Sequence, residues 1–329
     1  MRNATAKMRH LTLLALALAA CGGSLGGEGS LEVLIEAEDV IVAGLDPGDG
    51  PADIRDGWQL RFDAYLVTVG AIDLHQSDDP ALAAAAADVY VIDLTQVPSS
   101  GATLWQLDAL AEGRWELHYE TAGAGDGALR HDSVDADDFA RMQDEDWTYL
   151  LRGALRKDDG ASCPPASLAS PPATAAQVGE NAAGDPCYEN PVITLELGAA
   201  AETRYGPCEV DGVPGVSVTA GATQTVAITI HGDHLLFNGF PEGGEGGTLR
   251  LAQWLADCDL DVDGAVTLAE LAAIAPSELV ELDERFQLGG SPITPLTTME
   301  DYVRAQLKTQ GHFQGEGECP ADGVGHDHG

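Results

Sequence analysis

Basic residues are scarce in this chain: 16 lysines and arginines stand against 54 aspartates and glutamates, which gives a formal net charge of −38. Such a charge repels nucleic acid and anionic lipid and attracts divalent cations, so nucleic-acid binding is excluded as a function. Strong acidity also occurs as a solubility adaptation to high salt. We take that adaptation as the explanation for most of the charge.

The sequence patterns of nucleophilic catalysis are absent as well. The chain has no Gly-x-Ser-x-Gly elbow, and none of its six cysteines lies in a context that activates a thiol. The tryptophans Trp58, Trp115, Trp147 and Trp254 lie on the apolar sides of periodic segments, so we expect them in the core rather than on a sugar-binding platform. We therefore predict that the protein is not an enzyme.

Long apolar runs are limited to the N-terminus. Residues Leu11 to Ala20 follow three basic residues and form an apolar stretch that is too short to span a bilayer, a pattern typical of an export signal. No later segment is a transmembrane candidate. Export places the protein in an oxidising compartment, where cysteines pair.

The end of this run, Leu18-Ala19-Ala20-Cys21-Gly22, resembles the lipobox of bacterial lipoproteins. The resemblance implies a signal peptide over residues 1–20, a lipid on Cys21, a tether over residues 21–30 and anchoring in a membrane of the cell envelope. Gly22, where an aspartate would favour the inner membrane, favours the outer membrane or the cell surface. The alternative is an ordinary cleavage site whose cysteine is incidental.

Once the lipid acceptor is set aside, five cysteines remain, so one must be left unpaired. Spacing and context favour a disulfide between Cys163 and Cys187, which closes a segment rich in proline, alanine and glycine. They favour a second between Cys208 and Cys319, which ties the C-terminal segment to the body. Cys258 lies on the apolar face of a predicted helix, where a free thiol serves as a small hydrophobe. Other pairings stay open at the level of the sequence.

Alternation of polar and apolar residues predicts a mainly β fold. The stretch Gly57 to Asp63 alternates cleanly and Tyr65 to Leu74 continues apolar, which predicts one long half-buried strand. Further strands are predicted within 31–45, 89–94, 115–120, 147–155, 192–197, 216–219 and 225–231. Their short spacing suits antiparallel pairing in a sandwich.

We therefore expect an antiparallel β-sandwich-like domain over residues 31–240, interrupted by an exposed Pro/Ala/Gly-rich loop at about 158–190. After residue 240 the pattern becomes helical, and Thr297-Thr298-Met299-Glu300 marks a helix start by a capping box. Residues 241–318 are expected to form an α-helical segment packed on the body, followed by a tail over 319–329.

The most specific chemistry lies in the twelve residues 259–270. Carboxylates at the first, third and fifth positions point hard oxygen ligands at one centre, and Gly264 permits the sharp turn around an ion. A backbone carbonyl, a hydroxyl and a final bidentate carboxylate can complete the shell. The predicted Ca²⁺ ligands are Asp259, Asp261, Asp263, Ala265 through its carbonyl, Thr267 and Glu270.

This loop and its flanks resemble the EF-hand family, and the resemblance implies calcium as the bound ion. The apolar helical faces on either side are Leu251, Trp254, Leu255 and Cys258 before the loop, and Leu271 and Ile274 after it. Pro276 is expected to end the exiting helix after about a turn and a half, and the sequence has no second loop of this pattern. A solitary hand with a short second helix has little to swing open, so we expect a structural calcium site. The alternative is an acidic turn that matches by composition.

A second metal pattern lies at His231-Gly232-Asp233-His234, where two imidazoles and a carboxylate end a predicted strand. This spacing could chelate zinc or copper, and His312 could join if distant parts of the chain meet. The alternative is a turn capped by hydrogen bonds. The C-terminal His326, Asp327 and His328 resemble a short metal-binding tail. These histidines give the alternative function of a zinc- or copper-handling envelope protein, or less favourably a metal-dependent hydrolase.

Over its whole length the chain is similar to a group of uncharacterised predicted lipoproteins from myxobacteria and their relatives. The residues that carry this likeness are Gly57-Trp58, Tyr65-Leu66-Val67, His231-Gly232-Asp233-His234, the calcium loop, Gly311-His312-Phe313, Gly315-Glu316-Gly317 and Cys319. The likeness implies export and calcium binding but names no substrate. The sequence therefore predicts a membrane-anchored, calcium-binding lipoprotein that serves as a non-enzymatic binding or structural module, with a protein or glycan partner left open.

Overall fold

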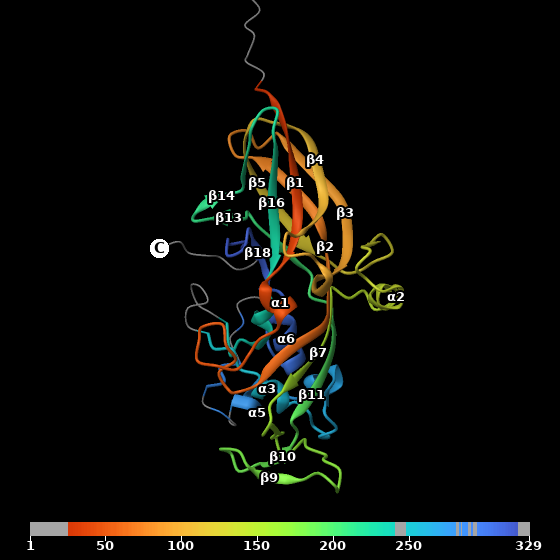
Figure 1. Cartoon of the computed structure of the whole chain (residues 1–329), viewed down its shortest axis with the longest axis vertical. Coiled ribbons are helices and arrows are strands. Elements are labelled where there is room, and N and C mark those ends of the chain that lie inside the picture. Colours follow the sequence, from red (N-terminus) through yellow and green to blue (C-terminus); the bar gives the residue numbers. More distant parts are fainter. Residues whose placement is uncertain are drawn as a thin grey trace, which may run out of the picture.

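The computed structural model describes residues 26–240, 248–280, 283, 285–288, 291 and 295–321. The predicted signal peptide, Cys21, the tether residues up to 25 and the C-terminal His326, Asp327 and His328 lie outside these residues. The described chain is mainly β, as the sequence predicts, and forms an elongated body whose long strands run along its axis (Figure 1).

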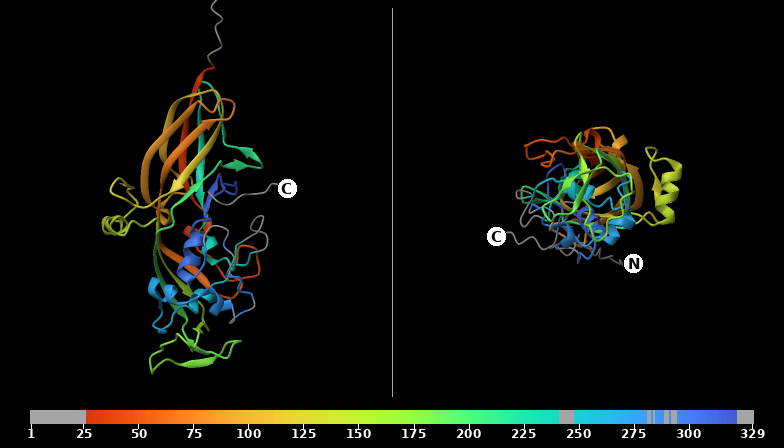
Figure 2. Two further views of the ribbon diagram at one scale, coloured as in Figure 1. Left: turned by 180° about the vertical axis from the view of Figure 1, so that it is seen from behind. Right: turned by 90° about the horizontal axis from the view of Figure 1, so that it is seen from below.

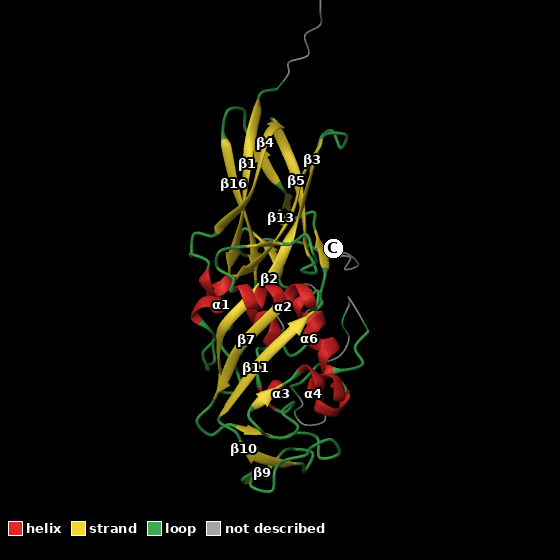
Figure 3. Cartoon of the chain, turned by 90° about the vertical axis from the view of Figure 1, so that its right-hand side faces the viewer, coloured by secondary structure: helices red, strands yellow, loops and turns green. Residues whose placement is uncertain are grey.

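Two sheets build the β-sandwich-like body, and they lie face to face in its upper half (Figures 1 and 3). The larger sheet has the order β12-β5-β2-β7-β11-β17, with β3 and β15 paired to β2 and β5, and β6 to β3. Its strands are β2 (Gln59–Gln76), β3 (Ala83–Asp93), β5 (Gly113–Thr121), β6 (Leu129–Arg130), β7 (Tyr149–Arg156), β11 (Val192–Ala199), β12 (Thr203–Tyr205), β15 (Val216–Val218) and β17 (Ala265–Val266). The four-stranded sheet has the order β18-β16-β1-β4, with β1 (Glu28–Ala37), β4 (Ala102–Ala111), β16 (Thr223–Ile230) and β18 (Gly311–Phe313).

Strand β2 links the two halves of the molecule. Its first part pairs with β7 and its second part with β3 and β5. Residues Ala64 to Gly70 are all buried, where alternation would bury every second residue, because both faces of the strand are covered there. The main core lies on one face, and a smaller cluster around Met142 of α2 (Ala136–Asp144) lies on the other. Helix α2 itself stands out at one side of the body (Figure 2).

Most neighbouring strands are antiparallel, as predicted, but β1 and β16 are parallel over eight residue pairs from Ser30 and Thr223 to Ala37 and Ile230. A parallel pair needs a long connection, and here most of the chain lies between the two strands. The alternating residues Leu31, Val33 and Ile35 of β1 are fully buried in the core between the sheets. The parallel register brings the C-terminal ends of β1 and β16 to the same level.

Short helices fill the lower half, beside the long strands β2, β7 and β11 (Figures 1 and 3). They are α1 (Asp39–Ala43), α3 (Gln253–Ala256), α4 (Leu268–Ala273), α5 (Pro276–Val280) and α6 (Met299–Leu307), with the 3₁₀ turns η1 (Leu94–Gln96) and η2 (Gly232–Leu236). The predicted capping box at α6 is shifted by one residue, because Thr298 caps the helix and pairs with Asp301 rather than Thr297 with Glu300. In the described residues no helix is both long enough and apolar enough to span a bilayer.

The Pro/Ala/Gly-rich segment at about 158–190 was predicted as an exposed loop, and that prediction is wrong in part. It forms a small sheet of β8 (Ala161–Ser162), β9 (Gln177–Glu180) and β10 (Pro186–Glu189) at the lower end of the molecule (Figure 1). Every residue of β9 is exposed, so its sequence carries no apolar alternation that could reveal a strand. The pairing is instead supported by a disulfide next to it.

Both predicted disulfides are present, Cys163–Cys187 and Cys208–Cys319, and Cys258 is a buried free thiol. The first closes the small sheet. The second holds the segment after β18 against the hairpin of β13 (Glu209–Val210) and β14 (Val213–Pro214), where Glu209 also bridges to Glu318. The C-terminal segment is therefore fastened to the β body, as the spacing of the cysteines predicts.

Candidate metal centres

The predicted calcium loop lies in the lower half, between α3 and α4 (Figure 3). Its entering helix is one turn long, Gln253–Ala256, and not the helix from Leu251 to Cys258 that the apolar periodicity predicts. The turn begins there because the N–H groups of Ala252 and Gln253 both donate to Asp56 Oδ2 at 2.8 Å. The exiting helix α4 is also short, and Pro276 begins the next helix, in line with the predicted early end.

Three of the predicted ligands converge in this loop. Oxygen atoms of Asp259, Asp261 and Asp263 lie within 4.8 Å of one another, with Asp259 buried and the other two exposed. Gly264 has a φ of +86°, which favours glycine, and its N–H donates to Asp259 Oδ2 at 2.9 Å. Burial raises the pKa of Asp259 to about 6. The ionised form of Asp259 is therefore unfavourable without a nearby positive charge, and a divalent cation would stabilise it.

Thr267 and Glu270 lie on the closing side of the loop, and Glu270 is not part of the group of converging oxygens. Thr267 caps α4, and Glu270 Oε2 accepts hydrogen bonds from the Thr267 N–H at 2.9 Å and its hydroxyl at 2.8 Å. Glu270 Oε1 accepts from the N–H of Leu260 at 2.9 Å. The carboxylate thus reaches across to the second residue of the loop. To coordinate an ion in a bidentate manner, the Glu270 carboxylate would have to give up these hydrogen bonds for bonds to the ion.

The calcium loop pairs with a strand of the larger sheet. Ala265, predicted to offer its carbonyl, lies in β17, which pairs in parallel with β11 through Thr194 and Leu195. Thr194 donates to the carbonyl oxygen of Gly264 from its N–H at 2.8 Å and from its hydroxyl at 3.0 Å. Strand β11 therefore holds the middle of the loop in place.

The disulfide-closed segment forms the opposite wall of the loop. Asn190 donates to Asp259 Oδ2 at 2.7 Å, and the N–H of Ser170 donates to the carbonyl of Leu260 at 2.8 Å. Next to the loop, the N–H of Cys163 donates to Asp257 Oδ1 at 2.8 Å. The sequence reasoning treated this segment and the loop as separate, and no local pattern in the sequence connects them.

The second predicted metal pattern is also brought together, with His312 added. Ring nitrogens of His231, His234 and His312 lie within 4.8 Å of one another, and the three residues are 2%, 4% and 9% exposed. The rings of His231 and His312 are stacked, with centroids 3.8 Å apart and planes 16° apart, and His234 meets both at a steep angle. His312 reaches the other two histidines because β18 pairs with β16, with His312 opposite Thr229.

Two carboxylates complete the histidine cluster. Glu38, His231 and Asp233 form a second group of possible ligands within 4.8 Å, and Glu38 was missed by the sequence reasoning. Burial and the neighbouring Asp233 raise the pKa of Glu38 to about 8. Asp233 forms an ion pair with Arg250 through Oδ2, whereas among the described residues no backbone N–H and no side chain other than Glu38 is placed to donate to its buried Oδ1. Burial therefore favours the protonated form of Glu38, which lies beside the ion pair of Asp233 and Arg250.

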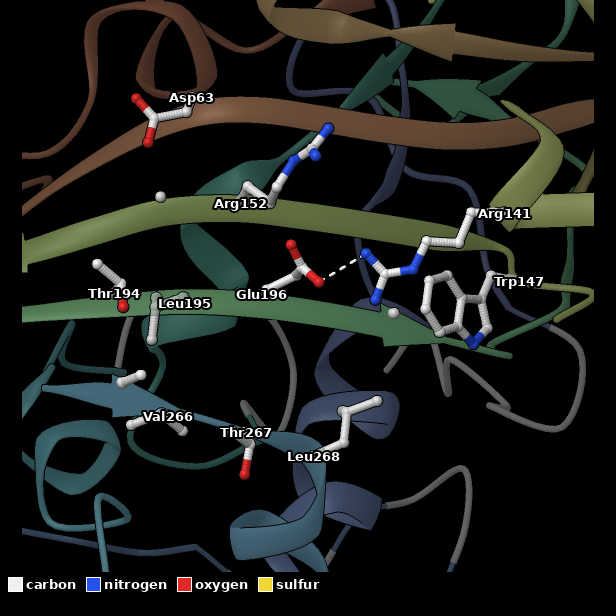
Figure 4. A pocket seen from close by; sticks show the side chains of 13 residues that line it. Asp63, Arg141, Trp147, Arg152, Thr194, Leu195, Glu196, Val266, Thr267 and Leu268 are labelled. Atoms are coloured by element: carbon white, nitrogen blue, oxygen red, sulfur yellow. Dashed lines mark hydrogen bonds and ion pairs between the residues drawn. The ribbon is translucent and has the colours of Figure 1, made fainter. Parts of the chain in front are cut away.

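A pocket of about 530 Å³ adjoins the calcium loop (Figure 4). Residues 265–268 form one side, and β7 and β11 form the floor. Arg141 pairs with Glu196 at 2.6 Å, and its guanidinium lies over the ring of Trp147 at 5.0 Å. Trp147 was predicted in the core, and that prediction is correct only in part: its partly buried indole packs against the smaller cluster around Met142 and on Gly198 of β11, and it also lines this pocket. Trp58, Trp115 and Trp254 are buried as predicted.

Comparisons with known proteins found no matching family model, no matching curated protein and no matching solved structure. The likeness to EF-hands therefore depends on the residues of the loop and on their arrangement in the fold.

Proposed function

We propose that the protein is an exported, lipid-anchored protein of the cell envelope that binds one Ca²⁺ in the loop 259–270, and that the ion stabilises a non-enzymatic binding module. The observation that carries the proposal is the convergence of Asp259, Asp261 and Asp263 on a turn made possible by Gly264. Carboxylates so close together repel one another, and a hard divalent cation converts that repulsion into attraction.

The surroundings of the loop favour a structural ion over a regulatory one. A switch of this kind needs two helices that can change their mutual angle, but α3 is one turn long and α4 has six residues. Strand β11 and Asn190 hold the loop from two sides. Binding free energy would therefore appear mainly as resistance to unfolding of the lower half.

The disulfides support the proposed export. Two disulfides form and persist in oxidising compartments, which is consistent with a protein outside the cytoplasm. Calcium modules outside the cell work with dissociation constants of about 10⁻⁴ to 10⁻³ M, so a loop with few ideal ligands can still be filled there. Anchoring through Cys21 is tested by membrane fractionation of wild type and Cys21→Ser. A variant that stays in the membrane fraction would remove the lipid anchor from the proposal.

The pocket beside the loop supplies the binding part of the proposal. Residues 265–268 line it directly, so an ion that fixes the loop also fixes one side of the pocket. The lining combines arginines, acidic groups and hydroxyl groups with apolar side chains such as Leu195, Val266 and Leu268, which suits a partner with both polar and apolar groups, such as a protein loop or a glycan. Because Arg141 covers the indole of Trp147, such a partner would be held by hydrogen bonds and ion pairs rather than by stacking on that face.

The decisive experiment compares thermal unfolding of the chelator-treated protein with and without Ca²⁺, with Mg²⁺ as the control cation. We expect calcium to raise the melting temperature in a concentration-dependent manner, and Mg²⁺ to do so weakly, because it demands a smaller and more regular oxygen shell. A melting temperature that does not respond to calcium would overturn the proposal.

A further inference from the structure

The histidine cluster lies at the waist of the molecule, where β1 and β16 end and β18 begins, near α1 (Figure 1). His231 follows β16, His234 lies in η2 and His312 lies in β18, which pairs with β16. Glu38 follows β1, and its N–H donates to the carbonyl of Ile230 at 3.1 Å. Three separate parts of the chain therefore deliver metal-binding side chains to one buried place.

The hydrogen bonds of the cluster set which ring nitrogens carry protons. The Thr309 hydroxyl donates to the carbonyl of Gln306 at 2.8 Å, so it accepts from His234 Nδ1 at 2.8 Å and places that ring's lone pair on Nε2. The carbonyl of Gly315 can only accept, so His231 Nε2, 3.2 Å away, is the protonated nitrogen of that ring. His231 and His234 are thus each oriented by a hydrogen bond that one ring N–H donates, the arrangement that metal-binding histidines use.

The carboxylates provide a fourth ligand and the charge that a cation needs. Glu38 Oε2 and Asp233 Oδ1 are both buried, and among the described residues no backbone N–H and no other side chain donates to either oxygen, although buried carboxylate oxygens are almost always satisfied. Both residues group with His231 within 4.8 Å. Two buried carboxylate oxygens that receive no such donor, beside three imidazoles, form a set of ligands that a divalent cation would satisfy.

We propose that His231, His234 and His312 bind a divalent transition metal, with Glu38 or Asp233 as the fourth ligand. Three imidazoles and one carboxylate suit tetrahedral zinc, and the same donors suit copper. This site is separate from the calcium loop, whose ligands are all oxygens, and it does not rest on the calcium proposal.

Metal binding requires one local movement. A tetrahedral ion at about 2.1 Å from each nitrogen brings those nitrogens to about 3.4 Å from one another. The stacked rings of His231 and His312 are only 16° from parallel, so their lone pairs cannot meet at one point. His312 is the most exposed of the three and belongs to a short strand, so the metal is expected to turn this ring and break the stack.

A closed and buried site of this kind serves structure rather than turnover, because four protein ligands leave no open position for a substrate. The ion would join the ends of β1 and β16 to β18. It would act together with the Cys208–Cys319 disulfide, which fastens the same C-terminal segment a few residues further on.

The test uses the full-length chain stripped of metal and then saturated with Ca²⁺, so that the acidic loop is filled. His326→Gln and His328→Gln are present in every protein compared, which removes binding by the C-terminal histidines. Titration with Co²⁺ is followed by its visible absorption, and zinc affinity is measured by competition with a chromophoric chelator. We expect one Co²⁺ per chain with the intense bands of a tetrahedral site.

His312→Gln should weaken zinc binding by about 100-fold or more, while His131→Gln is the matched control. His131 is also a hydrogen-bonded histidine, but it pairs with Ser133, away from the cluster. Glu38→Gln should change the Co²⁺ spectrum if this carboxylate is the fourth ligand, and weaken binding by about 10- to 100-fold if it only orients His231. Melting curves recorded without metal show whether each variant is folded.

Two outcomes would overturn the proposal: a parent protein that shows no tetrahedral Co²⁺ spectrum, or a folded His312→Gln protein that binds zinc as tightly as its parent. Either outcome would identify the cluster as hydrogen-bonded histidines that hold β18 without an ion. Neither outcome affects the calcium-dependent melting temperature, so the two metal proposals fail separately.

Discussion

The side chain of Asn190 donates one hydrogen bond to Asp259 at 2.7 Å and another to Ser162 at 2.9 Å. Asn190 directly follows the small sheet closed by the Cys163–Cys187 disulfide, and Asp259 is the first carboxylate of the calcium loop. One amide therefore links the two walls of the site.

Glu270→Gln should abolish most of the calcium-dependent gain in melting temperature. The substitution removes the charge of the proposed bidentate ligand, whereas glutamine still supports the capping box at Thr267. We expect calcium affinity to fall by about 100-fold, an effect on the order of 3 kcal/mol, measured by calorimetric titration. Asp301→Asn is the matched control, because it makes the same change in the capping box of α6, away from the loop. Equal calcium affinities of Glu270→Gln and wild type would remove Glu270 from the ligand set.

Asn190→Ala should destabilise the protein even without calcium. It leaves a buried Asp259 oxygen with one donor fewer and deprives Ser162 of its partner, which costs about 1 to 3 kcal/mol. Chemical denaturation measures this loss. Asn181→Ala, in the same disulfide-closed segment, is the control, since Asn181 only orders an outer turn through Ala183 and Asp185. A loss no larger than that of the control would show that the link to Asp259 carries no stability.

Removing the Cys163–Cys187 disulfide should lower the free energy of unfolding by about 3 kcal/mol, because the bond closes a loop with a sequence separation of 24. The double substitution to serine should also weaken calcium binding, since the N–H of Cys163 donates to Asp257 beside the loop. Non-reducing peptide mapping checks the pairing.

Burial raises the pKa of the Cys258 thiol, so it should react with thiol reagents only after unfolding. A Cys258 that is readily labelled in the folded protein would contradict its buried position.

Asp56→Asn should flatten part of the pH dependence of stability. Burial raises the pKa of Asp56 above its ordinary value, despite hydrogen bonds from Gln253 and Ala252. The folded protein thus holds this proton more tightly than the unfolded chain, and the stability from Asp56 is present at low pH and lost as pH rises through the folded pKa. Asparagine can accept both N–H bonds without ionising. We expect the melting temperature of the variant, relative to wild type, to increase as the pH rises above about 4, the ordinary pKa of an aspartate. A difference that does not change over this range would exclude the titration of Asp56.

Local patterns in the sequence were enough to predict the mainly β fold, the long strand β2, both disulfides and the convergence of Asp259, Asp261 and Asp263. These features depend on alternation, composition and spacing within short stretches. The entering helix was predicted too long because the apolar residues Leu251 and Cys258 are buried by tertiary packing and not by a helical face. At these two positions, burial by tertiary contacts gives the same apolar spacing in the sequence that a longer helix would give.

The contacts that complete the candidate sites were not predictable from the sequence. Glu38 reaches the histidine cluster because β1 pairs with β16 in parallel, with Ala37 opposite Ile230, so that the residues after both strands meet. Asn190 reaches Asp259 because β11 runs beside β17. In both cases the partners are far apart in the chain, and their proximity is set by strand order and register.

The position of β1 has a mechanical consequence. This strand begins at Glu28 at the upper end of the body and runs along the long axis between β16 and β4 (Figure 1). A force that pulls Gly26 away from the lower end would load the backbone hydrogen bonds on both sides of β1 in shear, so they would have to break together. A strand peeled from the edge of a sheet loses its bonds one at a time and yields at a smaller force. A protein held by its first residues and pulled from its far end would therefore resist extension through the strand that is nearest to its attachment.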